Sequence, residues 1–214
     1  MKENSRIEIL DALRGFCILL VIAYHLGYNL VAGGYLPEKT LYNPLLAVLR
    51  PLFAGIFVVL AGVSSRFSKN NFKRGGLLLL CAGAVSLAAY INNTPIWFGI
   101  LHLLAACVFL YAFLEKLRIT LPAVLIGAFF LARFGITVWP VLKSYDYFPI
   151  VPWGFVFFAG VILGGPIKDG LFPKWFYGLK VPVLPAVGRR TLVIYLAHQP
   201  VLYGLMLLFE TAAG

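Results

Sequence analysis

The sequence is poor in charge, and poorest in acidic charge. Charged residues make up 12% of its 214 residues, with eight Asp or Glu against 18 Lys or Arg, whereas hydrophobic residues make up 61%. Soluble globular domains carry roughly 25% charged residues. This composition excludes a soluble globular domain and indicates a polytopic integral membrane protein.

Acidic side chains are missing from the central part of every long apolar run. A histidine in such a run has no carboxylate in its own run to orient it, which argues against a Ser-His-Asp relay. The three cysteines, Cys17, Cys81 and Cys107, are odd in number and have no metal-like spacing. We therefore expect them to pack as small apolar side chains, and we expect no metal site.

Seven apolar runs are long enough to cross a bilayer, which takes about 17 to 25 helical residues. They span residues 12–32, 43–65, 75–92, 97–114, 120–140, 149–165 and 190–209. The prediction is an all-α membrane helix bundle of about seven transmembrane helices, forming one domain over residues 1–214. The connection at residues 165–188 contains four prolines, which forbid a long helix, and we expect it to lie along the cytoplasmic interface.

The basic residues predict the orientation of this bundle. With a cytoplasmic N-terminus, fourteen of the 18 Lys and Arg residues fall on the inner side, and only Lys39 and Lys143 fall in outer loops. Cytoplasmic loops carry an excess of Lys and Arg, so we expect the N-terminus inside and, after seven spans, the C-terminus outside. The net charge of +10 is largely this topology signal, and we predict the lipid bilayer, not a nucleic acid, as the partner.

Arg14 and His25 share one face of the first run. Eleven helical steps separate them, which bring His25 back to within about 20° of Arg14 and place it about 16 Å deeper along a helix. Asp11 stands three residues before Arg14, and we expect the two to pair on the helix surface. Asn29 lies one turn beyond His25 and is the nearest candidate to orient its imidazole.

The three histidines fall at similar depth in the first, fourth and seventh runs: His25, His102 and His198. An ionisable group at that depth is costly unless it faces protein or water, so each is a candidate catalytic residue. A hydrogen-bonded structural histidine is the alternative at each position.

Two arginines, Arg50 and Arg133, lie inside predicted runs at a depth similar to that of the histidines. Together these side chains favour a polar, water-accessible pocket. The arginines are candidates to hold an anionic acceptor, with pairing to helix carbonyls as the alternative. Tyr24 and Tyr28, on either side of His25, are candidates to hydrogen-bond a substrate.

The chain resembles the heparan-α-glucosaminide N-acetyltransferase catalytic-domain family, which is distantly similar to the acyltransferase 3 family. The resemblance lies in RIEILDALRGFCILLVIAYHLGYN, in FAGIFVVLAGVSSRFSKNNFKRG, in FGILHLLA and in VGRRTLVIYLAHQPVL. It implies an integral membrane acyltransferase that moves an acetyl or other acyl group from cytosolic acyl-CoA to an acceptor, usually a sugar. It also places Arg14 and His25 at the family's arginine and catalytic positions.

Cations on the inner side fit such a donor, because the phosphates of CoA need cations and helix N-termini. The candidate CoA-binding residues are Arg66, Lys69, Lys73, Arg74, Arg189 and Arg190. Their alternative role is to fix the topology alone. A neutral His25 is the expected general base for attack on the thioester, and an acyl-histidine intermediate is the competing mechanism.

Three functional hypotheses follow. The first is an acetyl-CoA-dependent acetyltransferase of the bacterial cytoplasmic membrane, with a glycan or another small amine or alcohol as acceptor. The second is a proton-coupled transporter that uses the intramembrane histidines, and the third is a non-catalytic membrane subunit. Small residues such as Gly160, Gly164 and Gly165 are candidates to pack helices within one chain or within a homodimer.

Overall fold

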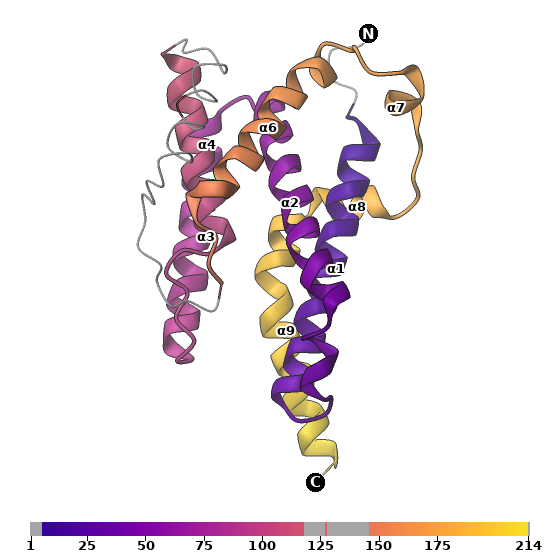
Figure 1. Ribbon diagram of the computed structural model, residues 1–214, viewed down its shortest axis with the longest axis vertical. Helices are drawn as coiled ribbons and strands as arrows, with labels where there is room; N and C mark the ends of the chain where they lie inside the picture. Colours follow the sequence, from indigo (N-terminus) through magenta and orange to yellow (C-terminus); the bar gives the residue numbers. More distant parts are fainter. Residues whose placement is uncertain (1–5, 118–126, 128–145, 214) are drawn as a thin grey trace. The chain divides into compact units, whose positions relative to one another are not determined.

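The computed structural model describes residues 6–117, 127 and 146–213, and these residues are mostly helical (Figure 1). Within them no strand forms beyond one isolated bridge between Phe98 and Tyr147. The long helices are α1 (Glu8–Ala32), α2 (Pro44–Phe67), α3 (Asn71–Ile91), α4 (Ile100–Lys116), α6 (Ile150–Lys168) and α9 (Thr191–Ala213). The short ones are η1 (Glu38–Thr40), α7 (Lys174–Gly178) and α8 (Leu184–Arg189).

Five of the described helices are long and apolar enough to cross a membrane: α1, α2, α3, α6 and α9. Over the described residues the structure thus confirms the predicted all-helical fold, with helices long and apolar enough to span a membrane. The predicted run at 97–114 forms α4, which has 17 residues and extends about 25 Å, slightly less than a bilayer core of about 30 Å. Apart from residue 127, the run at 120–140, with Arg133, lies outside the described residues, so the count of seven spans stays a prediction, as does the orientation.

The proline-rich connection is confirmed as free of a long helix. Between Lys168 and Thr191 the chain forms only α7, with five residues, and α8, with six. The preceding helix, α6, extends to Lys168 and includes Pro166, beyond the predicted boundary at residue 165. The three cysteines are free, and Cys17 and Cys107 are buried, as expected of apolar packing residues.

The chain divides into two compact units. The terminal unit consists of residues 1–57 and 172–214, and the central unit of residues 58–171. In the terminal unit, α1 packs against α8 and runs beside α9 (Figure 1). In the central unit, α3 lies beside α4, which also contacts α6.

Glycines determine how closely the helices approach within each unit. In the terminal unit, a Cβ atom added to Gly188 would lie 1.7 Å from the carbonyl oxygen of Asp11, and one added to Gly15 would lie 2.3 Å from that of Leu184. In the central unit, a Cβ on Gly160 would lie 2.1 Å from the oxygen of Val59. The backbones therefore touch at these crossings, as small residues permit in membrane helix pairs. Gly160 and Gly164 thus pack helices within one chain, and the homodimer stays a prediction.

Candidate functional site

The terminal unit brings His25 of α1 and His198 of α9 together. Their ring centroids lie 5.0 Å apart, with the rings tilted by 57°. The sequence placed both side chains at similar depth, and the packing of α1 against α9 makes them neighbours. The two rings therefore form a histidine pair across two membrane-spanning helices.

His198 is held by its own helix. Its side chain is 8% exposed, and its Nδ1 is hydrogen-bonded to the carbonyl oxygen of Tyr195, three residues earlier. A carbonyl only accepts, so Nδ1 carries the proton and Nε2 keeps a lone pair. Among the described residues this Nε2 is buried without a hydrogen-bond partner. It is therefore an oriented proton acceptor beside His25.

His25 is oriented by an amide that the sequence analysis missed. The Nε2 atom of Gln199 lies 2.9 Å from Nδ1 of His25, and Nδ2 of Asn29 donates to Oε1 of Gln199 at 3.2 Å. The expectation that Asn29 orients His25 directly is therefore corrected. Asn29 acts through Gln199, whose amide bridges Asn29 and His25, one turn apart on α1. Gln199 is the only glutamine of the sequence and lies inside an apolar run, which is the signal that would have found it.

Tyr24 and Arg50 lie next to this pair. The rings of Tyr24 and His25 are 5.7 Å apart, edge to face, and Arg50 donates to the hydroxyl of Tyr24 at 2.8 Å with its guanidinium 5.3 Å from the ring centroid. Arg50 thus pairs with a tyrosine, an arrangement that the sequence analysis did not consider. Tyr28 is exposed on the surface of α1.

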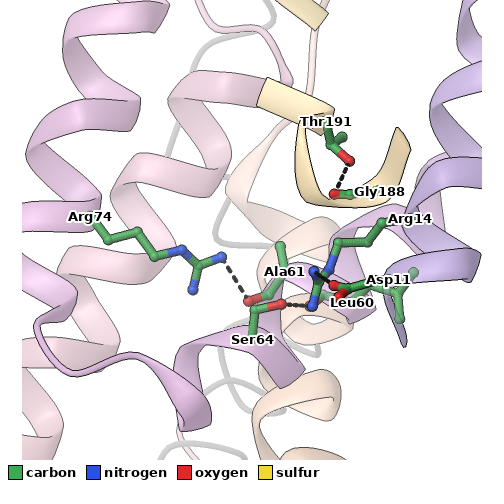
Figure 2. A network of polar contacts seen from close by, with 8 residues as sticks. All are labelled: Asp11, Arg14, Leu60, Ala61, Ser64, Arg74, Gly188 and Thr191. Carbon is green, nitrogen blue, oxygen red and sulfur yellow. Dashed lines mark hydrogen bonds and ion pairs between the residues drawn. The ribbon is translucent and has the colours of Figure 1, made fainter. Parts of the chain in front are cut away.

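Arg14 pairs with Asp11 as predicted (Figure 2). The pair is not on an open helix surface, however, because Asp11 is only 7% exposed. The close crossing at Gly188 places α8 against the backbone of Asp11, which corrects the expectation of a surface pair. Thr191, which begins α9, donates its hydroxyl to the carbonyl of Gly188 at 2.6 Å (Figure 2).

His102 belongs to the central unit and has local partners. The amide of Gly99 donates to its Nδ1 at 3.3 Å, and its Nε2 lies 3.5 Å from the hydroxyl of Ser86. That hydroxyl donates to the carbonyl of Ile96 at 2.6 Å. A neutral ring with its proton on Nε2 satisfies each of these bonds, and the arrangement fits the structural alternative for this histidine.

The same end of α4 is capped by Asp146, a residue that the sequence analysis did not single out. Its Oδ2 accepts from the amide of Ile100 at 3.3 Å and lies 2.6 Å from where a Cβ atom on Gly99 would be. Burial raises the pKa of Asp146 to about 6, although the bond from Ile100 acts in the opposite direction. The folded protein therefore holds a proton here at a pH where the unfolded chain has lost it.

We expect this proton to make stability fall as the pH rises. Between about pH 4 and pH 6 the folded state binds a proton that the unfolded state has released, so the free energy of unfolding decreases by about 2 kcal/mol over this range and levels off above about pH 7. Asp146→Asn should remove this slope, measured as the apparent Tm in detergent from pH 4 to pH 7. Asp169→Asn, at an exposed carboxylate that ends α6, is the control and should keep the wild-type slope. An unchanged slope in Asp146→Asn would contradict the assignment.

The cationic candidates for CoA binding fall in both units. Arg189 and Arg190, in the terminal unit, are exposed where α8 ends and α9 begins. In the central unit Lys69 and Lys73 are also exposed. The two arginines of the central unit, Arg66 and Arg74, turn inward.

These inward-turning arginines bind groups of their own unit. Arg66 donates to the hydroxyl of Tyr111 at 3.2 Å. Arg74 donates to Oγ of Ser65 at 2.8 Å. It also donates to the carbonyl of Ala61 at 3.2 Å (Figure 2). Both therefore help to hold helices of the central unit together, whereas the two exposed lysines present their charge to the surroundings.

Comparisons with known proteins place this sequence in a family. The model of the family described as heparan-alpha-glucosaminide N-acetyltransferase, catalytic, matches residues 6–200. No curated protein and no solved structure gave a significant match. The matched range includes both histidines of the pair, Gln199 and every cationic candidate. The chain belongs to the heparan-alpha-glucosaminide N-acetyltransferase catalytic-domain family, a family of membrane acetyltransferases.

Proposed function

We propose that the protein is an integral membrane acetyltransferase that moves an acetyl or other acyl group from cytosolic acyl-CoA to a sugar or another small amine or alcohol. The observation that carries the proposal is the pair of His25 and His198, with the amides of Asn29 and Gln199 on one side of it. Family membership supplies the reaction class. A bacterial cytoplasmic membrane is the proposed location.

The proposed chemistry needs one proton acceptor near the thioester. The hydroxyl or amine of the acceptor attacks the thioester carbon while Nε2 of His25, the nitrogen that Gln199 does not contact, takes its proton. The carbon–sulfur bond then breaks, the acyl group stays on the acceptor, and the CoA thiolate receives a proton. The ring of His198 beside it offers a second acceptor for that proton, and Tyr24 and Arg50 offer donors for the acceptor molecule.

The start of α9 suits the nucleotide end of acyl-CoA. Arg189 and Arg190 are exposed there, beside the amides that begin a long helix, and phosphates bind well at such a terminus. Arg190 precedes His198 by eight residues, or about 12 Å of helix, a distance that the extended pantetheine arm of CoA exceeds. One CoA molecule held at this end therefore has the length to bring its thioester to the histidine pair.

Calorimetric binding of acetyl-CoA to the purified protein in detergent tests this proposal. We expect saturable binding, and we expect Arg189→Ala/Arg190→Ala to weaken it about 10- to 100-fold, because one or two charge-assisted hydrogen bonds to phosphate are lost. Lys69→Ala/Lys73→Ala tests the other exposed cations in the same way. Lys116→Ala/Lys174→Ala removes the same charge from exposed positions outside the candidate set and is the matched control.

The outcomes separate the proposal from its rivals. Equal weakening in the control would mean that charge alone attracts the nucleotide. No binding by the folded protein would contradict the acetyltransferase proposal, and proton or solute flux in liposomes would then favour the transporter. Binding that is followed by transfer of labelled acetyl to one member of a panel of amino sugars and alcohols would identify the acceptor.

A further inference from the structure

We propose that Gln199 is the positioning residue of His25 and that its amide sets which ring nitrogen of His25 carries the proton. The proposal rests on the proposed function only for the use that is made of His25. Its physical content is the hydrogen-bonded chain from Asn29 to Gln199 to His25, which links α1 and α9. In a Ser-His-Asp site a carboxylate takes this position.

The amide of Gln199 is held at both ends. Its oxygen accepts from Asn29, which is 3% exposed and therefore fixed by packing. The NH₂ group then faces Nδ1 of His25 at 2.9 Å. Since that NH₂ group only donates, Nδ1 must accept, and the proton of the neutral ring lies on Nε2. In this orientation of the two amides, His25 is held in the tautomer that carries its proton on Nε2.

An amide differs from a carboxylate because a rotation by half a turn exchanges its donor and its acceptor. When both amides rotate by half a turn, Nδ1–H of His25 donates to the oxygen of Gln199, whose NH₂ group donates to the oxygen of Asn29. Nε2 then carries the lone pair that a general base needs. Only the nitrogen and oxygen of each amide exchange places, and the hydrogen bonds are satisfied in both directions. Gln199 therefore holds His25 both as a donor and as a base, whereas a carboxylate would hold only the second form.

The other polar groups around the pair do not replace this contact. His198, Tyr24 and Tyr195 lie beside the rings, and Arg50 binds Tyr24. The carboxylates of the described terminal unit are on Glu8, Asp11, Glu38 and Glu210, and none of them bonds to either histidine. The described bond that fixes Nδ1 of His25 is the one from Gln199.

The test is ¹⁵N NMR of the full chain, labelled at histidine and purified in detergent. Three histidines give few signals, and each is assigned by its loss in a His→Asn variant. Protonated and unprotonated ring nitrogens of a neutral histidine resonate far apart, so the spectrum reports the tautomer directly. In the wild type we expect an unprotonated Nδ1 for His25.

Two variants change the amide. In Gln199→Leu the hydrogen bond is lost, and we expect the ¹⁵N signals of His25 to move to the averaged positions of two exchanging tautomers. In the nearly isosteric Gln199→Glu only an acceptor remains, so we expect a protonated Nδ1 and a midpoint of the His25 titration at least one pH unit higher. The glutamate variant keeps the test decisive where the leucine variant fails to fold.

Kinetics give a second readout. We expect Gln199→Leu to lower kcat about 10- to 100-fold with the KM for acetyl-CoA unchanged, because the base is misplaced while the nucleotide end is untouched. Tyr203→Phe, at an exposed position one turn further along α9, is the control and should leave both readouts at wild-type values.

Failure of this inference and failure of the proposed function are distinguishable. His25 signals that stay at their wild-type positions in both Gln199 variants would overturn the positioning role, whatever the enzyme does. The predicted NMR changes in a protein that transfers no acetyl group would uphold the positioning role and contradict the acetyltransferase proposal.

Discussion

Alanine at His25 is expected to reduce acetyl transfer about 10²- to 10⁴-fold, the range that general base catalysis contributes. The loss should appear in kcat. His25 lies about 16 Å along α1 from Arg14, and it is not one of the exposed cations proposed to bind the nucleotide. The Kd for acetyl-CoA should therefore change less than about threefold. Release of the CoA thiol and transfer of labelled acetyl, measured together, give both constants.

Two further observations separate chemistry from structure at His25. The variant leaves a ring-sized space beside His198 and Gln199, so added imidazole should restore part of the activity. The wild-type rate should also decline at acidic pH, with a midpoint near or below the ordinary histidine value of about 6.5, and the variant should lack this limb. Normal turnover in folded His25→Ala protein would rule out His25 as the base.

Gly188→Ala is expected to have the largest effect on stability. The added Cβ atom would meet the carbonyl oxygen of Asp11 at 1.7 Å and the amide nitrogen of Gly15 at 3.0 Å. These are backbone atoms of a long helix, which cannot rotate away, so α8 has to move off α1. Overpacking of this kind costs about 3 kcal/mol or more, and we expect a lower apparent Tm and a lower yield of folded protein.

The matched control is Gly204→Ala in α9. A Cβ atom there meets nothing within 4 Å, and alanine favours a helix interior over glycine by roughly 0.5–1 kcal/mol. Gly204→Ala should therefore keep or raise the Tm measured under the same conditions. Equal Tm values for the two alanine variants would show that α8 does not rest on the backbone of α1.

The apolar runs and the low fraction of charged residues were enough to predict the helices. In a membrane each run has to form all its backbone hydrogen bonds within itself. The runs at 12–32, 75–92 and 190–209 all coincide with long helices. The sequence could not supply the path of the chain through residues 165–188. Its prolines exclude a long helix there, but the contact of Gly188 with Asp11 depends on how α8 packs against α1.

Only part of the candidate site could be predicted, because contacts between helices depend on packing. Helical rise gives the depth of a side chain and not its neighbour, so His25, His102 and His198 looked equivalent. The structure pairs His25 with His198 and places His102 at the start of α4 with Ser86 and Gly99. Gln199 was not among the predicted site residues, because its amide is neutral and the depth argument concerned ionisable groups.

That neutral amide has a consequence for how the site responds to an energised membrane. The membrane potential exerts about 2.3 kcal/mol per 100 mV on an elementary charge that crosses it completely. A site built on an ionised aspartate would carry such a charge at all times. The chain of Asn29, Gln199 and a neutral His25 carries none, so its resting geometry is indifferent to the voltage across the bilayer, and only the short-lived protonated state feels the field.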